Sequence, residues 1–147
     1  MIKLDNENVF VGSTNISTTP IKPFDSSVIN FLDLISKEIQ NNSKTKFNSE
    51  ISTFGFFCRK KNIQKLKKIY FIEKIGTIRL GLGLAFHVTP SNIPTNFAYS
   101  LIFSLLCGNS NIIKLPSQNF YEIEQLCFIF NKVYLQMKLI MLYLNLT

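Results

Sequence analysis

The sequence predicts an α/β fold in which a βαβ unit with two parallel strands follows a helical N-terminal region. Two short apolar runs typical of buried strands, residues 84–88 and 111–115, each end close to a proline. Residues 96–106, which lie between them, carry apolar residues at helical spacing. Neighbouring strands joined through a helix run in the same direction, so this order of elements indicates a parallel sheet.

The N-terminal part begins with an arm. Residues 1–19 are rich in Ser, Thr and Asn, show no clear period and are expected to form a loose segment. A first helix is expected over residues 23–42, where apolar residues recur at spacings of three and four: Phe24, Val28, Phe31, Leu32, Ile35 and Ile39. Asp25 or Ser26 can cap its start, because a short oxygen-bearing side chain accepts from a free backbone N–H. The Asn-Asn-Ser run at residues 41–43 is expected to end it.

A second helix is expected over residues 49–71, with Ser49 as its N-cap. Its apolar stripe consists of Ile51, Phe54, Phe57 and Cys58. Gly55 weakens this helix by about 1 kcal/mol relative to alanine.

Composition and charge exclude some classes of protein. The chain has 147 residues, 46% of them apolar and 17% charged, which is typical of one modest globular domain rather than a disordered chain. The net charge of +7 suits an anionic partner, and six basic residues gather in the second helix: Arg59, Lys60, Lys61, Lys65, Lys67 and Lys68. No base-stacking aromatics alternate with them and no nucleic-acid motif frames them. A solvated helix face is therefore favoured, and no nucleic-acid partner is expected.

The cysteines and the N-terminus indicate a cytoplasmic protein. The three cysteines are widely spaced and give neither a disulfide framework nor a zinc pattern: Cys58, Cys107 and Cys127. Reduced thiols are the simplest account of them. The first ten residues lack the sustained apolar core of a signal peptide, so secretion is not expected.

A last helical pattern starts near Gln118 and continues into an apolar tail, residues 126–146. A membrane span requires about 20 residues with few or no charges. Lys132 and Lys138 interrupt the tail near its middle. These charges favour a helix that has lost its packing partner over a helix that crosses a membrane.

Both strands of the predicted sheet lead into polar loops at their carboxyl ends, where open parallel sheets bind ligands. The first leads into Pro90-Ser91-Asn92-Ile93-Pro94, in which two prolines fix the backbone on both sides of Ser91 and Asn92. A carboxamide on a stiff loop is a good hydrogen-bond donor for an oxygen that gains negative charge during a reaction. Lys114, at the end of the second strand, can present an ammonium group to a nucleotide phosphate or ribose.

Each of these residues also has an ordinary structural interpretation, which composition alone favours. Asn92 is then a turn residue bonded to its own backbone, and Lys114 a surface lysine. His87, the one histidine, is interpreted as a hydrogen-bonded core residue rather than a general base or metal ligand, and no metal site is expected. The Gly-Leu-Gly run at residues 81–83 precedes a strand and lacks the third glycine of a dinucleotide fingerprint. We interpret these glycines as easing the entry of the chain into the sheet.

Residues 79–120 resemble the N-terminal cofactor-domain segment of LuxC-type acyl-CoA reductases. The features that carry the resemblance are a Pro-x-Asn-x-Pro corner, a helix ending in Gly-Asn and a strand ending in Lys-x-x-Ser: Pro90 to Pro94, Gly108-Asn109 and Lys114 to Ser117. With the helical region upstream, the resemblance extends over about residues 23–130. This family, which supplies long-chain aldehyde in bacterial bioluminescence, belongs to the aldehyde dehydrogenase superfamily. The resemblance therefore implies a partial Rossmann-like cofactor domain.

The resemblance also implies an activity and roles for residues. The family reduces an acyl-CoA to a fatty aldehyde with NADPH through an acyl-cysteine intermediate. Asn92 matches the asparagine that stabilises the oxyanion. Lys114 and Ser117 match the region that holds the adenosine ribose or its 2′-phosphate, and Pro90 and Ser91 belong to the same cofactor-binding corner.

None of the three cysteines matches the nucleophile of the family. The chain is therefore expected to be an N-terminal part, inactive alone, with an arm and helical region (residues 1–75) and a truncated nucleotide-binding region (residues 76–147). Two alternatives stay open. One is a non-enzymatic module that pairs with a full-length reductase through its exposed sheet edge and its apolar C-terminal tail. The other is a peripheral protein held at a membrane by its C-terminal helix.

Overall fold

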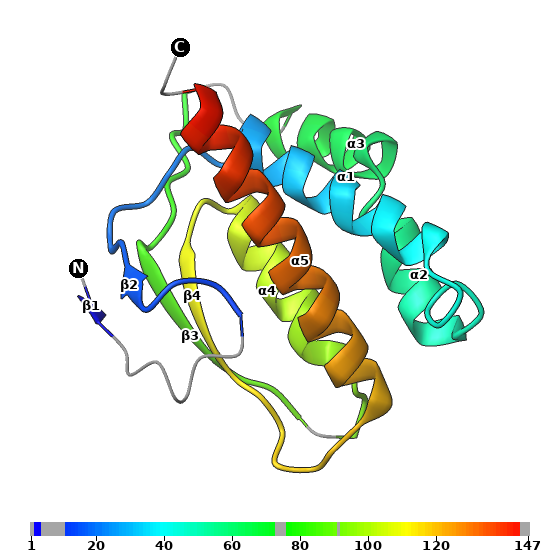
Figure 1. The fold of residues 1–147 in the computed structure, drawn as a ribbon. Coiled ribbons are helices and arrows are strands. Elements are labelled where there is room, and N and C mark those ends of the chain that lie inside the picture. Colours follow the sequence, from blue (N-terminus) through cyan, green and yellow to red (C-terminus); the bar gives the residue numbers. More distant parts are fainter. Residues whose placement is uncertain (1, 4–10, 73–75, 91, 145–147) are drawn as a thin grey trace.

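The structure is a computed structural model that describes residues 2–3, 11–72, 76–90 and 92–144. Its elements in chain order are β1 (Ile2–Lys3), β2 (Asn15–Ile16), α1 (Ser26–Asn41), α2 (Ser49–Phe57), α3 (Lys60–Ile72), β3 (Leu84–Val88), α4 (Asn96–Leu106), β4 (Ser110–Lys114) and α5 (Tyr121–Leu144). Within these described ranges, five helices and two small sheets form a mixed α/β fold (Figure 1).

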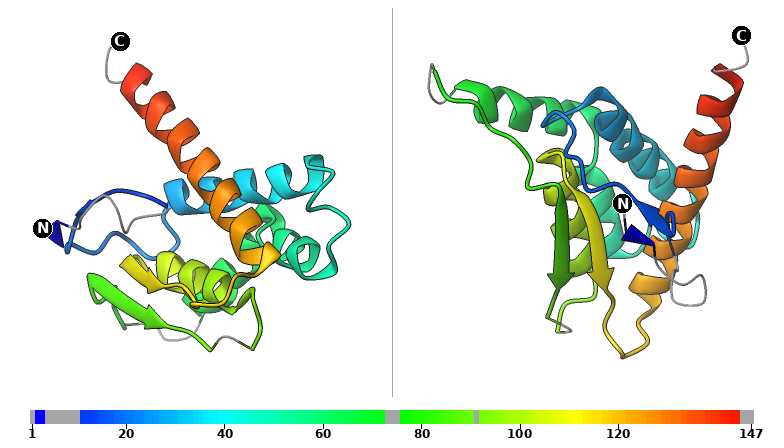
Figure 2. Two further views of the ribbon diagram at one scale, coloured as in Figure 1. Left: turned by 60° about the horizontal axis from the view of Figure 1, so that its bottom comes forward. Right: turned by 90° about the vertical axis from the view of Figure 1, so that its left-hand side faces the viewer.

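The predicted βαβ unit is confirmed. β3 and β4 form a parallel pair, and α4 connects them. Leu84 lies opposite Ser110 at the start of the pair, and Val88 lies opposite Lys114 at its end. α4 packs against both strands (Figure 2). In the part of the chain that is described, this sheet has two strands, so a larger Rossmann-like sheet is not confirmed.

The N-terminal arm carries more structure than the sequence predicts. β1 and β2 pair in antiparallel fashion, with Ile2 opposite Ile16. Beyond β2 the arm runs against the C-terminal end of α4. The backbone N–H of Ile21 donates to the carbonyl of Gly108 at 2.9 Å, and that of Phe24 donates to the carbonyl of Leu106 at 2.7 Å. These two bonds fix the end of the arm to the βαβ unit.

α1 begins where the sequence predicts, because Asp25 caps it. The Asp25 carboxylate accepts hydrogen bonds from the backbone N–H and the hydroxyl of Ser27, at 2.8 and 2.6 Å. The hydrogen bond from the Ser27 hydroxyl is the main reason that the pKa of Asp25 lies below its ordinary value of 3.8. The backbone bond from Ser27 lowers this pKa further, and burial opposes both effects.

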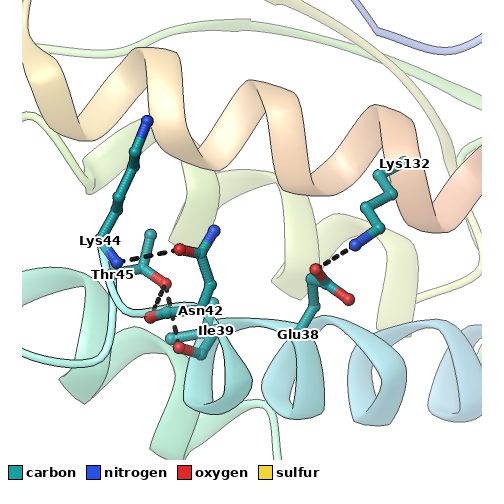
Figure 3. A network of polar contacts seen from close by, with 6 residues as sticks. All are labelled: Glu38, Ile39, Asn42, Lys44, Thr45 and Lys132. Carbon is teal, nitrogen blue, oxygen red and sulfur yellow. Dashed lines mark hydrogen bonds and ion pairs between the residues drawn. The ribbon is translucent and has the colours of Figure 1, made fainter.

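α1 also ends within the predicted Asn-rich segment, with Asn42 as its C-cap. The Thr45 hydroxyl donates to the carbonyl of Ile39 at 2.9 Å, which satisfies one of the carbonyls that a helix end leaves free (Figure 3). An ion pair between Glu38 and Lys132 joins the same part of α1 to α5 (Figure 3).

The prediction of a single helix over residues 49–71 is wrong, because the chain turns between α2 and α3. In a continuous helix the backbone N–H of Lys60 would donate to the carbonyl of Phe56. Instead it donates to the carboxylate of Asp33 on α1, at 3.0 Å. The Phe56 carbonyl accepts from the side-chain amide of Asn62 at 2.7 Å. Side chains thus replace the helical bond and allow α3 to take a new direction.

Two details of α2 differ from expectation. Its N-cap is Asn48, not Ser49, and the Asn48 side chain accepts from the backbone N–H of Ile51 at 3.1 Å. Gly55 has a packing role, since an added Cβ would lie 2.8 Å from Cγ2 of Ile39 on α1. The glycine therefore allows α1 and α2 to approach closely.

All five helices contribute to one apolar core. Its largest fully buried apolar side chains are Phe54, Phe130, Leu32, Ile35, Ile39, Ile51, Ile63, Ile102, Leu126, Ile129 and Val133. The ring of Phe54 on α2 lies 5.1 Å from the ring of Tyr99 on α4 and 5.9 Å from that of Phe130 on α5, between centroids. The helices before residue 75 therefore share a core with the helices after it.

The interpretation of the apolar tail as a helix without a packing partner is wrong for the first half of α5. This half buries Ile123, Leu126, Ile129, Phe130 and Val133 in the common core. The far end of α5 extends beyond the other elements (Figure 2). Among the described helices, none combines the length and the apolar character that crossing a bilayer requires.

Candidate functional site at the carboxyl ends of β3 and β4

The carboxyl ends of β3 and β4 lie side by side. Val88, the last residue of β3, is opposite Lys114, the last residue of β4. Both strands therefore end at the same side of the sheet, which we call its carboxyl edge. Both arrows in the right-hand view of Figure 2 point to this edge, and the loops that follow lie beyond it. The polar residues predicted for the two loops therefore share one edge of the unit.

The predicted site residues are exposed where they are described. The side chains of Pro90, Asn92, Lys114 and Ser117 are open to solvent, and Ser91 lies outside the described residues. Within the described part, the Asn92 carboxamide makes no hydrogen bond. Its two interpretations, an ordinary turn residue and an oxyanion donor, therefore both stay predictions.

The corner between β3 and α4 is a turn that starts the helix. The backbone N–H of Asn96 donates to the carbonyl of Ile93 at 3.2 Å, and that of Ala98 donates to the carbonyl of Thr95 at 3.0 Å. Thr95 is buried and gives no side-chain cap to α4. Asn92 lies one residue before this turn, at its solvent side.

Thr89, which follows β3 directly, contributes a polar atom that sequence reasoning missed. Its Oγ1 is buried and has no hydrogen-bond partner among the described residues. A buried hydroxyl without a partner costs free energy, on the order of 1 to 3 kcal/mol.

His87 is hydrogen-bonded, as predicted, but it is half-buried and does not belong to the apolar core. Nδ1 lies 2.8 Å from Oγ of Ser100 on α4, and Nε2 lies 2.8 Å from Oδ1 of Asn111 on β4. The side-chain amide of Asn111 donates to the backbone carbonyl of Asn109 at 2.9 Å. One imidazole ring thus joins β3, β4 and α4 just inside the carboxyl edge.

The partners of His87 define its tautomer. The Asn109 carbonyl can only accept, so the NH₂ group of Asn111 must face it and the Asn111 oxygen must face the imidazole. That oxygen also can only accept, so Nε2 of His87 carries the hydrogen. In the neutral ring Nδ1 then accepts from the Ser100 hydroxyl.

Asn109 closes the opposite end of the unit, at the start of β3 and β4. Its Oδ1 accepts from the backbone N–H of Leu82 at 2.6 Å, and its Nδ2 donates to the hydroxyl of Ser104 at 3.1 Å. Gly108, directly before it, has φ of 88°, the left-handed conformation that commonly ends a helix. Sequence reasoning noted the Gly-Asn pair as a family feature but missed that the carboxamide attaches the entry of β3 to α4.

The entry of β3 requires a glycine, as predicted. Gly83 has φ of 98°, and a Cβ there would lie 2.3 Å from the carbonyl oxygen of Thr18 in the arm. A Cβ on Gly81 would lie 2.7 Å from Oδ1 of Asn109. The Gly-Leu-Gly run therefore serves close backbone packing.

The three cysteines are free thiols, and none lies at the carboxyl edge. Cys58 is fully buried, and burial raises the pKa of its thiol. Burial also raises the pKa of Cys127, on α5, to about 11. Cys107 is the C-cap of α4, and the corner lies at the other end of this helix, about 15 Å away along an axis that rises roughly 1.5 Å per residue.

A further feature of the surface lies away from the carboxyl edge, on α3. A shallow hollow on the outer side of α3 is lined by Gln64, Lys67, Lys68 and Phe71. Among the described residues, no group of three or more His, Cys, Asp or Glu side chains is arranged to hold a metal ion.

The parallel βαβ unit places the molecule in the α/β class of folds. Residues 73–141 match the family model described as Acyl-CoA reductase (LuxC). The resemblance to LuxC-type acyl-CoA reductases is therefore confirmed over the βαβ unit and most of α5, just under half of the chain. No curated protein and no solved structure matches the chain.

Proposed function

We propose that this chain is part of an NADPH-dependent acyl-CoA reductase of the LuxC type, which converts an acyl-CoA to a fatty aldehyde in the cytoplasm. The observation that carries the proposal is the family match over residues 73–141, which contains the strand pair and both polar loops. Three free cysteines suit a reducing compartment. The chain contributes one wall of the site, and the nucleophile comes from another polypeptide segment.

In this proposal Asn92 stabilises negative charge on the substrate. When a cysteine thiolate attacks the carbonyl carbon of the thioester, the carbonyl oxygen gains negative charge before coenzyme A leaves. The Asn92 carboxamide is exposed and makes no hydrogen bond within the described residues, so both its N–H groups are available to that oxygen. The turn at the start of α4 limits the movement of the loop that carries it.

The residues at the carboxyl edge fit a nicotinamide nucleotide, which would supply the hydride. Lys114 and Ser117 offer an exposed ammonium group and an exposed hydroxyl, which are donors that ribose and phosphate oxygens accept. We assign these two residues to the adenosine ribose or its 2′-phosphate, and Pro90 and Ser91 to the corner that limits the site.

The chain is proposed to be inactive alone, because its cysteines are poorly suited to attack a thioester at this edge. Only a thiolate is a good nucleophile, and burial keeps Cys58 and Cys127 protonated. Cys107 lies at the wrong end of α4. An assay with the purified chain, an acyl-CoA and NADPH should detect no oxidation of NADPH. Turnover by the chain alone would contradict this part of the proposal.

The cofactor assignment is tested by titrating NADPH into the protein and following nucleotide fluorescence. Lys114→Ala should weaken binding at least tenfold, the effect of losing a charge-assisted hydrogen bond worth about 1.5 to 3 kcal/mol. Lys44→Ala removes an exposed lysine elsewhere and should change nothing. No binding by the original chain, or equal binding by both variants, would overturn the assignment.

A second candidate function is a non-enzymatic module that joins a full-length reductase through its sheet. Parallel sheets are normally covered on both faces, whereas α4 covers one face of β3 and β4. On the other face Phe86 and Val88 are 63% and 69% exposed. Co-purification with a full-length reductase, lost on Phe86→Ser but kept on Phe128→Ser in α5, would support this function. If the chain stays monomeric and does not bind the reductase, this second function is excluded.

A further inference from the structure

The outer side of α3 carries a row of lysines. Lys61, Lys65 and Lys68 are spaced by four and three residues, so they line one face of the helix, and all three are exposed. The helix sequence KKNIQKLKKIYFI contains five lysines and no acidic residue. Its opposite side is anchored to the core through Ile63, which is fully buried. The lysine row is therefore held in a fixed orientation toward solvent.

The C-terminal end of α3 is apolar and equally exposed. Ile72, the next residue along the lysine row, is 77% exposed, and Phe71 beside it is also exposed. The chain returns past this end, because the Arg79 guanidinium lies 4.6 Å over the Tyr70 ring and donates to the Tyr70 carbonyl at 2.9 Å. Ile78, next to Arg79, is 87% exposed. In the right-hand view of Figure 2 this end of α3 projects from the body of the molecule.

A hollow connects the two parts. It is lined by Gln64, Lys67, Lys68 and Phe71, and the surface that these side chains present to it is mainly apolar. Lys67 uses one of its three donors on the carbonyl of Phe24, at 3.3 Å, and keeps two. The hollow is thus a mainly apolar depression between the lysine row and the apolar end of α3.

We propose that this surface of α3, formed by Lys61, Lys65, Lys68, Phe71, Ile72 and Ile78, docks the protein on an anionic lipid membrane. The apolar end enters the boundary between headgroups and acyl chains, and the lysine row lies against the headgroup phosphates. This contact is peripheral and is independent of the proposed reductase activity. It is also distinct from α5, which packs its first half into the core.

The combination of charge and apolar surface favours a membrane over the other partners that a basic helix could bind. A solvated face would not require large apolar side chains at its end. The lysines could contact the phosphates of a nucleic acid, but the two exposed isoleucines would contribute nothing to that binding. A bilayer with anionic lipids fits both the lysine row and the apolar end of α3, because it presents negative phosphates above hydrocarbon.

The test is sedimentation of the full chain with vesicles of phosphatidylserine and phosphatidylcholine in equal amounts. The chain should bind these vesicles and bind pure phosphatidylcholine far more weakly. The triple change Lys61→Gln, Lys65→Gln, Lys68→Gln should weaken binding roughly a hundredfold, from about fivefold per basic residue. The pair Ile72→Ser, Ile78→Ser should weaken it at least tenfold on the loss of two inserted side chains.

Matched controls separate this surface from the others. Phe128→Ser and Leu135→Ser remove exposed apolar residues of α5 and should leave binding unchanged. Circular dichroism would confirm that each variant is folded, which is expected because every changed side chain is exposed. The proposal is overturned if the chain does not bind anionic vesicles or binds neutral ones equally. It is also overturned if the α5 changes alone abolish binding, or if the chain binds duplex nucleic acid and no vesicles.

Discussion

α1 and β3 differ in how completely other elements cover them. α1 buries six residues, Val28, Ile29, Leu32, Ile35, Ser36 and Ile39, and contacts each of the other four helices of the described chain. β3 buries none of its five residues fully, and every second side chain from Phe86 onward faces solvent. The apolar side of α1 is therefore covered by other helices of this chain. The strand pair has α4 on one face and an exposed apolar surface on the other.

The difference shows that the two regions are stabilised in different ways. Removal of apolar area from water stabilises the helices, by about 25 cal/mol per Å². The strand pair depends more on specific polar contacts, namely the imidazole of His87 and the carboxamide of Asn109. Loops that carry ligand-binding residues are usually held on such a scaffold at its least covered edge.

The largest expected effect on stability comes from creating a cavity in the core between the helices. Phe54→Ala removes a fully buried ring that contacts Tyr99 and Phe130. The free energy of unfolding should fall by about 3 to 5 kcal/mol, the usual cost of deleting a buried aromatic side chain. Denaturant titration measures it. Phe56→Ala, on the exposed side of the same helix, should cost far less, and an equal loss would show that the core between the helices is not the main source of stability.

Next in size is the junction between the two regions. Gly108→Ala places a Cβ 2.1 Å from the carbonyl oxygen of Ile21, at φ of 88°. The loss of stability should exceed the roughly 1 to 2 kcal/mol of the left-handed conformation alone, because the arm must move away. The matched control is Gly12→Ala, where φ is 97° and nothing lies within 4 Å. Faster hydrogen exchange at the Ile21 N–H should accompany the first change only.

A smaller effect is expected from the polar bridge of the strand pair. His87→Leu leaves Ser100 and Asn111 without their partner, which should cost about 1 to 3 kcal/mol. Nitrogen-15 NMR of the original protein should show the hydrogen on Nε2. If the hydrogen is instead on Nδ1, the network around Asn111 is wrong. Ser100→Ala, which removes only one member of the network, should cost less than the loss of the ring.

The smallest effect concerns the cap of α1, and it depends on pH. Asp25→Ala should cost about 1 kcal/mol at neutral pH. The folded state lowers the pKa of Asp25 below 3.8, so its carboxylate stabilises the fold above that value. This stabilisation is lost as the pH falls below 3.8 and through the folded pKa. Asp25→Asn keeps a capping oxygen but cannot titrate, so its stability should lack this acid-dependent loss. Because the site is largely exposed, the change is a fraction of a kcal/mol.

Local patterns were enough to predict most elements. Leu84–Val88 was predicted residue by residue, because a short apolar run between a glycine and a proline is typical of a buried strand. The start of α1 followed from Asp25, and the end of α4 from Gly108, since caps depend on neighbouring backbone groups only. The edge shared by Val88 and Lys114 followed from the parallel connection.

Features that depend on distant residues were missed. The break after α2 exists because Asp33, on another helix, accepts from Lys60, and no local signal announces such a partner. The same is true of Asn109 with Leu82 and of His87 with Ser100. The apolar face of α5 was visible in the sequence, but its cover by α1 and α2 depends on the tertiary arrangement.

The bonds from Ile21 and Phe24 to the end of α4 also set an order of events during synthesis. The arm leaves the ribosome early, yet its acceptors at Leu106 and Gly108 are made much later. Until then the donors of the arm have only water as a partner, and α1 can contact α2 and α3 but not α4 or α5. Long-range contacts of this kind slow folding, because a long loop must close before they form. Docking of the arm should therefore be among the last steps as the chain folds.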